Sequence, residues 1–579
     1  MNQLYYGDNL SILREYIGDE LVDLIYLDPP FNSKRDYNLL FSSPKGQQSE
    51  SQITAFEDSW HWCPQAEREL DELGSQPNTD VTEMMLSLVS FLGRNDMTAY
   101  LVMMSTRLLE LHRVLKPTGS LYLHCDPTAS HYLKIVLDGV FGKDRFKSEI
   151  IWRRTGSHNK AVRWAPIHDT IFFYTKSPSH TWNSPKRPYM AGHVKDNFLP
   201  DGKGGYKTAY YGNVLTGSGT RNGESGLPWQ GFDPTAKGRH WAIPGKIWDE
   251  LDEDITGLSQ HQKLDLLLEL GCIKIEPGAA WPMYERTIQA GEGPAASDIW
   301  AFQPYTEGTV FGTDLGIDAD VSWLKPQDEE RLGYPTQKPL ALLERIISAS
   351  SNAGDVVLDP FCGCGTAVHA AQRLNRRWIG IDITHLAVSL IEKRLSDAYG
   401  DRCKYDVHGT PKDLDAARDL ATRDKYQFQW WAVSLIDAQP FQGKKKGSDG
   451  GIDGLKFFHD LKGSSAKKIV VSVKGGALKA DDIRSLMAVR EREKAEFGFL
   501  ISLSEPTPKM RADSASAGFY ESDAGQKYPR VQFLTIEGLL SGKQRAEHPD
   551  YVKDVNFKKA KREVQKRHTH RDLFTDDDE

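Results

Sequence analysis

Apolar runs and segments of helical period alternate along the first 145 residues of the chain. The runs 21–28 (LVDLIYLD) and 119–126 (GSLYLHCD) are apolar, end in an acidic residue and predict strands. Between them, 100–115 (YLVMMSTRLLELHRVL) repeats its apolar residues with the spacing of a helix. Strands that alternate with helices pair in parallel, so we expect an α/β sheet.

The same alternation resumes further along the chain. The sequence predicts a helix over 339–351, a strand over 356–359, a helix over 365–375 and a strand over 378–383. Residues 150–330 break the pattern, because glycine, aromatic and basic residues gather there in irregular stretches typical of loops. We interpret this as one sheet that is interrupted by a loop-rich insert.

A second, smaller α/β pattern begins near residue 426, where a helix, two strands, a helix and a further strand follow one another. We therefore predict six regions: 1–149, the first half of the sheet; 150–330, the insert; 331–405, the second half of the sheet; 406–425, a linker; 426–545, a second domain; and 546–579, a charged, frayed tail.

Composition narrows the class of protein. The 579 residues include 72 Lys and Arg against 80 Asp and Glu, a net charge of −8, which argues against a wholly basic nucleic-acid coat but allows a local basic groove. No apolar stretch is long enough to cross a membrane, and the first residues lack the features of an export signal. Six cysteines are too few for a disulfide framework, so we expect a reducing cytoplasm and no membrane association.

A glycine-containing turn joins the strand 356–359 to the helix that follows it. In VVLDPFCGCGTAVHAA, Asp359 ends the strand and Gly363 and Gly365 precede the helix, so the backbone could approach a ligand closely. The third glycine of a dinucleotide fingerprint and the lysine of a P-loop are both missing, which disfavours pyrophosphate. Asp382, at the end of the next strand, could accept hydrogen bonds from ribose hydroxyls. Taken alone, such a turn also serves packing.

A second motif, Asp28-Pro29-Pro30-Phe31, ends the strand 21–28. The prolines remove two N–H donors, which leaves the carbonyls and the Asp28 carboxylate as acceptors at the strand edge where open α/β sheets bind ligands. Acceptors beside the aromatic face of Phe31 suit the exocyclic amino group of a flat base. The alternative is a plain Asp-Pro turn.

Together, Asp-Pro-Pro-Phe, Tyr-Pro-Thr-Gln-Lys-Pro (334–339) and Asp-Pro-Phe-x-Gly-x-Gly resemble the β-group of amino-group DNA methyltransferases over roughly residues 1–400. The order, with the catalytic motif first and the cofactor motif last, also matches. The resemblance implies a Rossmann-like S-adenosylmethionine-dependent methyltransferase sheet with an inserted target-recognition region. It further implies site-specific methylation of adenine N6 in duplex DNA, in a restriction–modification or defence system. Cytosine-N4 methylation is the alternative, because both enzyme types share these motifs.

The resemblance also suggests roles for individual residues. The residues implied to bind the cofactor are Asp8, Lys338, Asp359, Phe361, Gly363, Gly365, Thr366 and Asp382. Asp28 and the Pro29 carbonyl would hold the two protons of the target amino group and turn its lone pair toward the methyl group. Pro30 completes the turn, and Phe31 would stack on a base that is flipped out of the duplex.

The insert supplies candidates for DNA recognition, because it combines cations with aromatic residues. The residues predicted to contact DNA are Lys203, Lys207, Arg221, Lys237, Arg239 and Trp241. A solvated, charge-rich surface is the alternative for each of them. The expected partner is double-stranded DNA; a separate restriction or translocase subunit and a homodimer remain open.

The second domain resembles the Mrr-type restriction endonucleases of the PD-(D/E)xK fold. Asp453 opens one strand and Lys474 ends the next, which matches a site where a carboxylate holds Mg²⁺ and a lysine acts on the phosphate or water. Ser472 stands where the family has Glu or Gln. We expect weak, Mg²⁺-dependent cleavage, with a DNA-binding remnant as the alternative. A further alternative for the whole chain is a DNA-binding or cleaving effector that acts through this domain.

Overall fold

The computed structural model describes residues 2–30, 35–42, 48–58, 61–76, 78–155, 164–187, 189–200, 205–251, 253–288, 293–300, 321, 323–325, 327–334, 336–441, 451–460, 465–549 and 560–563. The described residues form two compact units. The first contains Met1–Asn183, Asp298–Trp300 and Val321–Glu579, and the second contains Ser184–Ser297.

The first unit is built on a mixed sheet with the strand order β14-β6-β7-β5-β2-β15-β16-β1-β17. Its strands are β1 (Asn2–Tyr6), β2 (Val22–Leu27), β5 (Leu115–Cys125), β6 (Phe146–Arg153), β7 (His168–Thr175), β14 (Ile299–Trp300), β15 (Val356–Asp359), β16 (Arg377–Asp382) and β17 (Tyr405–His408). From β5 to β17 the pairing is parallel, whereas β7 runs antiparallel to both β5 and β6. The α/β sheet expected for residues 1–405 is therefore present, with β15 placed directly beside β2.

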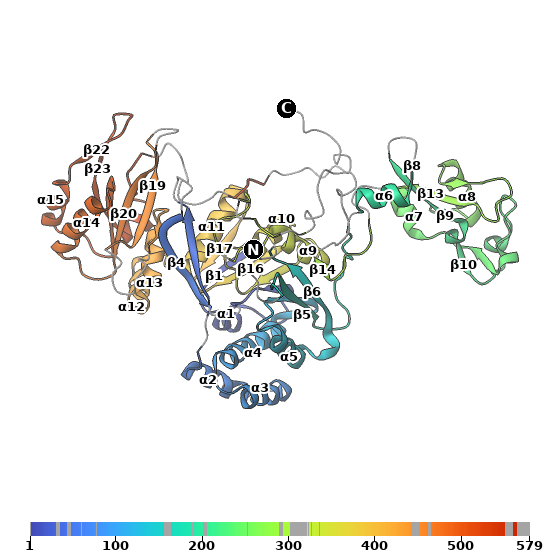
Figure 1. Ribbon diagram of the computed structural model, residues 1–579, viewed down its shortest axis with the longest axis horizontal. Coiled ribbons are helices and arrows are strands. Elements are labelled where there is room, and N and C mark those ends of the chain that lie inside the picture. The colour runs from blue at the N-terminus through green and yellow to red at the C-terminus, as the bar shows by residue number, and fades with distance from the viewer. Residues whose placement is uncertain are drawn as a thin grey trace. The chain divides into compact units, whose positions relative to one another are not determined.

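Helices cover both faces of this sheet (Figure 1). They are α1 (Asn9–Tyr16), α2 (Pro64–Leu73), α3 (Thr79–Leu92), α4 (Asp96–Val114), α5 (Ser130–Phe141), α9 (Leu340–Ser350), α10 (Thr366–Arg373) and α11 (His385–Tyr399). Ile25, Leu121 and Leu358 face one core with α4 and α5. On the other face, the hydroxyl of Ser350 in α9 meets that of Tyr122 at 2.7 Å. Because both faces are covered, the central strands contain runs of buried apolar residues, such as Leu24–Leu27 in β2 and Val356–Leu358 in β15.

Helix α4 shows how the sequence specifies these elements. Asn95 caps its first turn by accepting hydrogen bonds from the backbone N–H groups of Met97 and Thr98, and the Thr98 side chain completes a capping box. Most of its side chains are buried around the whole circumference, because α4 packs between the sheet and its neighbouring helices.

The insert is smaller than predicted, and it contains more regular secondary structure than predicted. Strands β6, β7 and β14 pair within the main sheet, so the separate unit is smaller than residues 150–330. It contains α6 (Ala191–Asn197), α7 (Gly245–Leu251), α8 (Gln260–Glu269), β8 (Leu199–Pro200), β9 (Tyr206–Tyr211), β10 (Thr216–Ser218), β11 (Arg239–Trp241), β12 (Ile273–Lys274) and β13 (Met283–Thr287). These short elements surround an aromatic core that includes Trp229, Trp241 and Trp248, which the loop-like sequence did not reveal.

A second sheet, β18-β19-β20-β21-β24, forms the C-terminal part of the first unit. Its elements are α12 (Leu414–Arg423), α13 (Lys425–Ser434), β18 (Gln439–Pro440), β19 (Gly454–Phe458), β20 (Lys467–Lys474), α14 (Ala480–Arg492), β21 (Phe497–Ser502), α15 (Pro508–Ala515), β22 (Phe519–Glu521), β23 (Lys527–Pro529), β24 (Val531–Thr535) and α16 (Ile536–Leu540). Helix α12 lies in the predicted linker, yet its Ala417 and Leu420 pack into this core. The linker is thus partly a structural element of the domain.

Two further features complete the first unit. Strands β3 (Arg35–Ser42) and β4 (Gln48–Asp58) form a hairpin that follows β2. Glu563, in the region expected to be a frayed tail, accepts a hydrogen bond from His369 Nε2 at 3.2 Å. Each of the six cysteines lies among the described residues and is free. Within the described residues, no helix has the length and apolarity needed to cross a membrane.

Candidate active site

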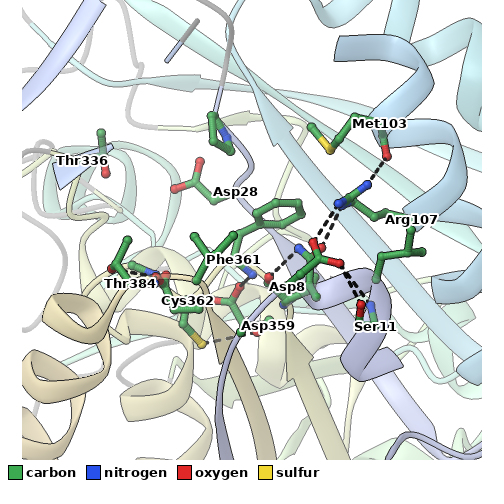
Figure 2. A pocket seen from close by; sticks show the side chains of 18 of the residues that line it. Asp8, Ser11, Asp28, Met103, Arg107, Thr336, Asp359, Phe361, Cys362 and Thr384 are labelled. Carbon is green, nitrogen blue, oxygen red and sulfur yellow. Dashed lines mark hydrogen bonds and ion pairs between the residues drawn. The ribbon is translucent and has the colours of Figure 1, made fainter. Parts of the chain in front are cut away.

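A cavity of about 630 Å³ lies where β1, β2, β15 and β16 end (Figure 2). The predicted site residues that line it are Asp8, Asp28, Pro30, Lys338, Asp359, Phe361, Gly363, Thr366 and Asp382. The carboxyl ends of parallel strands meet at this edge of the sheet, which is where α/β folds place their ligands. The two sequence motifs, far apart in the chain, therefore contribute to one cavity.

Two of the predicted residues that the structure describes do not line the cavity. Pro29 is buried, and Gly365 is the N-cap residue of α10. Phe31 lies outside the described residues. The stacking role of Phe31 therefore remains a prediction from the sequence.

Asp28 is held by Lys338. The lysine Nζ donates a hydrogen bond to Asp28 Oδ2 in a close ion pair, and it also lies 3.4 Å from the carbonyl oxygen of Thr336. The two charged side chains are only 9% and 16% exposed, so water screens their attraction weakly. The sequence resemblance implies that Lys338 packs beside the cofactor, which stays a prediction; in the structure its ammonium contacts the carboxylate of the Asp-Pro-Pro-Phe motif.

The glycines of the turn after β15 are required by the backbone. Gly363 has φ +51°, and a Cβ at this position would lie 3.2 Å from the ring of Tyr334. Gly365 has φ +75°, and a Cβ there would lie 2.7 Å from Ile391. Only glycine adopts these left-handed conformations without strain and also avoids these contacts. The Gly363 N–H donates to Asp382 Oδ2 at 2.9 Å, which ties the turn to the end of β16.

Two buried carboxyl groups lie under this turn. Burial raises the pKa of Asp382 to about 6, although hydrogen bonds from Thr384 and Gly363 oppose the shift. Burial also raises the pKa of Asp359 well above its ordinary value, and the charges of Asp28 and Asp382 add to the increase. The cavity thus concentrates acidic groups, which favours a ligand that carries positive charge.

Arg107 and Asn9 belong to the site but were not identified from the sequence. Arg107, on α4, donates to Asp8 Oδ1 at 2.8 Å and to Asn9 Oδ1 at 2.8 Å. Asn9 in turn donates to the carbonyl oxygen of Pro360 at 3.0 Å. These hydrogen bonds link the start of α1 to the turn after β15. Residues 100–115 contain two arginines, Arg107 and Arg113, and the sequence gives no signal that distinguishes Arg107 as a site residue.

We expect Gly363→Val to block binding of the ligand, because the new side chain would meet Tyr334 and alter the turn that forms the cavity wall. Calorimetric titration of the folded variant with S-adenosylmethionine measures the effect. Gly354→Val is the matched control, since Gly354 also has a left-handed φ (+87°) but a Cβ there has nothing within 4 Å. Unchanged affinity in Gly363→Val would show that the turn is only structural.

In the second unit, the predicted DNA-contacting residues have different environments. Arg221 is exposed. Lys207 pairs with Glu285 at 2.8 Å, Arg239 donates to the Thr216 carbonyl at 3.2 Å, and the Lys237 ammonium lies 4.5 Å from the centre of the Trp281 ring. Lys203 lies outside the described residues.

Trp241 requires a correction. Its side chain is 1% exposed and its indole N–H donates to the Leu227 carbonyl at 3.0 Å, inside the aromatic core of the second unit. It cannot contact DNA in this structure. Tryptophan serves cores as readily as interfaces, and the loop-like sequence gave no core pattern against which to judge it.

In the C-terminal sheet, Asp453 and Lys474 are both engaged by protein groups. The Asp453 carboxylate accepts hydrogen bonds from Gln429 Nε2 at 2.8 Å, from the Val473 N–H at 2.7 Å and from the Ser472 hydroxyl at 3.3 Å. Lys474 pairs with Asp482 at 3.3 Å. Among the residues that the structure describes, no group of three His, Cys, Asp or Glu side chains could hold a metal ion.

Residues 22–393 match the family described as DNA methylase, of the N6/N4 type. The chain is 28% identical over 405 residues to the type II methyltransferase M.EcaI of Enterobacter cloacae, which covers 68% of this chain and 69% of that protein. It is 24% identical over 387 residues to the Mod subunit of the type III restriction-modification enzyme StyLTI of Salmonella typhimurium, covering 64% of this chain and 49% of the subunit. Among solved structures, an M1.HpyAVI–SAM complex covers 68% of this chain and 99% of that one, at 15% identity and a TM-score of 0.29. Residues 433–540 match the family described as NACHT-associated inactive Restriction Endonuclease 1.

The family match and the similarity to M.EcaI show that the chain is a DNA methyltransferase. The chain belongs to the N6/N4 DNA methylase family and is homologous to the methyltransferases of restriction–modification systems. Its methyl donor is S-adenosylmethionine.

Proposed function

We propose that this chain is a site-specific DNA methyltransferase that modifies the N6 amino group of adenine in duplex DNA, as part of a restriction–modification or defence system. The observation that carries the proposal is the Asp28 carboxylate, held by Lys338 in the same cavity as the glycine turn after β15. The form Asp-Pro-Pro-Phe favours adenine. Cytosine N4 is the second candidate, because the same acceptors would also suit its amino group.

The residues of the cavity fit the methyl donor. S-Adenosylmethionine carries a cationic sulfonium and an ammonium group, and the cavity presents Asp8, Asp359 and Asp382 together with a glycine turn that allows close approach. We assign Asp382 to the ribose hydroxyls, Asp359 and Gly363 to the methionine part, and Asp8 to the adenine end. When bound, this group supplies an electrophilic methyl carbon.

The residues at the end of β2 would prepare the target nitrogen. An exocyclic amino group is a poor nucleophile, since its lone pair is delocalised into the ring. Hydrogen bonds from this group to Asp28 and to the Pro29 carbonyl would fix its two protons and turn the lone pair toward the methyl carbon. Asp28 would then receive the proton that the nitrogen loses after transfer.

The target base has to leave the duplex to reach this cavity. Phe31 is the proposed stacking face, and exposed cations of the second unit such as Arg221 are the proposed phosphate or groove contacts. We place the protein in the cytoplasm with double-stranded DNA as substrate. A restriction or translocase subunit is a proposed partner, in line with the similarity to a Mod subunit.

A transfer assay tests the proposed reaction. The purified chain is incubated with duplex DNA and labelled S-adenosylmethionine, and the digested nucleosides are separated and identified by mass. Label in N6-methyladenine supports the proposal; label in N4-methylcytosine supports the second candidate. Absence of label from both nucleosides across varied duplex sequences contradicts the proposed function.

We infer a separate role for the C-terminal sheet, namely binding of DNA without cleavage. The carboxylate of Asp453 is occupied by Gln429, Ser472 and the Val473 N–H, and Ser472 adds no negative charge for a metal ion. A Mg²⁺ site needs several anionic or carbonyl oxygens. This interpretation replaces the expected weak cleavage and agrees with the match to an inactive endonuclease family.

We therefore expect no cleavage of unmethylated or methylated duplex DNA by the full chain at millimolar Mg²⁺ or Mn²⁺. Gel analysis compares the wild type with Lys474→Ala, and the two should be indistinguishable. Cleavage that depends on the metal and disappears in Lys474→Ala would restore the nuclease interpretation.

A further inference from the structure

A buried chain of polar side chains lies beside Asp28 and has no part in the mechanism described above. The Tyr26 hydroxyl lies 2.9 Å from His124 Nδ1, and His124 Nε2 lies 3.1 Å from Asp169 Oδ2. Tyr26, His124 and Asp169 are 2%, 0% and 2% exposed. Burying three polar groups costs desolvation free energy. Their hydrogen bonds to one another offset that cost but do not explain why polar residues occupy these positions.

The register of the sheet places these hydrogen-bonded side chains next to the active site. Tyr26 pairs with Tyr122 and Leu27 with Leu123 across β2 and β5, so the next pair places Asp28 beside His124. Side chains alternate between faces, and Tyr26 and Asp28 are two residues apart on one face. Both also line the cavity. Tyr26, the first member of the hydrogen-bonded series, therefore lies at the cavity wall next to Asp28, the proposed acceptor of the target amino group.

The charges around Asp169 decide the direction of the hydrogen bonds. Burial would raise the pKa of Asp169, but the hydrogen bond from His124 and the nearby charges of Arg154 and Lys338 hold it below its ordinary value. Arg154 Nε lies 3.2 Å from Asp169 Oδ1. An ionised carboxylate only accepts, so His124 donates through Nε2 and, when neutral, accepts at Nδ1.

The phenol of Tyr26 is then fixed. Burial and the charges of Asp28 and Asp359 raise its pKa well above the ordinary value, so the hydroxyl keeps its proton and donates a hydrogen bond to Nδ1 of a neutral His124. Its oxygen retains lone pairs that can accept a hydrogen bond from another group. The imidazole ring of His124 is also held from the side, because Trp152 packs edge-on against it with 5.6 Å between the ring centroids.

We propose that Tyr26 is a further functional residue of the methyltransferase site, whose hydroxyl shares with Asp28 the amino proton that Asp28 accepts, and that His124 and Asp169 are positioning residues that orient this hydroxyl. The inference rests on the proposed function, because the group to be oriented is the target amino nitrogen. The array would act on the transfer step, by restricting the orientation of that nitrogen, and would leave binding of S-adenosylmethionine unchanged.

The chain offers a matched control for a purely structural role. Tyr122, one strand away, is also 2% exposed, and its hydroxyl also meets one buried partner, Ser350 Oγ at 2.7 Å. Tyr122 does not line the cavity. Tyr26→Phe and Tyr122→Phe each remove one buried hydroxyl and its hydrogen bond, so the costs in thermal stability should be similar.

The test is single-turnover methyl transfer by full-length wild type, Tyr26→Phe, Asp169→Asn, the double variant and Tyr122→Phe, on duplex DNA containing the methylated site. We expect Tyr26→Phe and Asp169→Asn each to lower the rate by about tenfold or more, with the double variant no slower than the slower single. Tyr122→Phe should stay within about twofold of wild type, and all should bind S-adenosylmethionine with the wild-type Kd within a few-fold.

Two results would overturn the inference: a Tyr26→Phe rate equal to that of Tyr122→Phe, or a double variant whose loss is the product of the single losses. Failure of the proposed function looks different. In that case the wild type itself transfers no methyl group to DNA, whereas failure of the inference alone leaves an active wild type that Asp28→Ala inactivates.

Discussion

Replacing Asp28 by alanine should lower the rate of methyl transfer at least about a hundredfold, the usual effect of removing a group that stabilises or orients the reacting atoms. The variant loses the side-chain acceptor at the end of β2, while the glycine turn and Asp382 stay in place. Affinity for S-adenosylmethionine should therefore change by no more than a few-fold. Single-turnover transfer to duplex DNA measures the rate, and calorimetric titration measures the affinity.

Asp19→Ala is a suitable control for this variant. Asp19 lies on the exposed surface, where it pairs with Arg113, and it does not line the cavity. It should transfer methyl groups at the wild-type rate. If Asp28→Ala keeps more than about a tenth of the wild-type rate, a loss of only about 1.4 kcal/mol in the barrier, Asp28 does not have the proposed role.

Lys338→Met should also lower the transfer rate strongly, by about tenfold to a hundredfold. Methionine has a similar length but no charge, so the variant leaves the Asp28 carboxylate in the cavity wall without its counter-ion. An unpaired charge in a buried place moves toward water or takes up a proton, and in either case it stops acting as a fixed acceptor. The same rate and affinity measurements apply.

Strand β2 provides the control, because it carries a second aspartate that is paired with a lysine. Asp23 pairs with Lys116 at 2.7 Å at the opposite end of the strand from Asp28. Lys116→Met should reduce thermal stability without slowing transfer per folded molecule. If Lys338→Met instead weakens S-adenosylmethionine binding more than tenfold while transfer at saturation is normal, Lys338 serves the cofactor, as the sequence resemblance implied.

Much of the main sheet could be predicted from the sequence. The runs 21–28, 119–126, 356–359 and 378–383 correspond to β2, β5, β15 and β16, because strands buried on both faces are continuous apolar runs. Hydrophobic periodicity does not indicate that β15 lies beside β2. The motifs do, because two ligand-binding turns at strand ends are expected to lie at the same edge of a sheet.

Other features could not be predicted because they depend on contacts between distant segments. Arg107 is one of several charged residues of α4, and only its hydrogen bonds to Asp8 and Asn9 mark it as part of the site. His124 and Asp169 come from separate strands, and β7 lies in a region that we had assigned to the insert. Trp241 looked like a surface aromatic, because the short elements around it leave no periodic pattern. In each case the local sequence was uninformative and the tertiary neighbours determined the role.

The central claim is that this chain methylates the amino group of a base in duplex DNA at a defined sequence, through Asp28. Modification-sensitive sequencing of DNA from cells that express the wild type or Asp28→Ala tests this claim most directly, since it reports the base, the position and the sequence context together. We predict N6-methyladenine at one recurring sequence with the wild type and at none with Asp28→Ala. Identical modification patterns in the two samples would contradict the account.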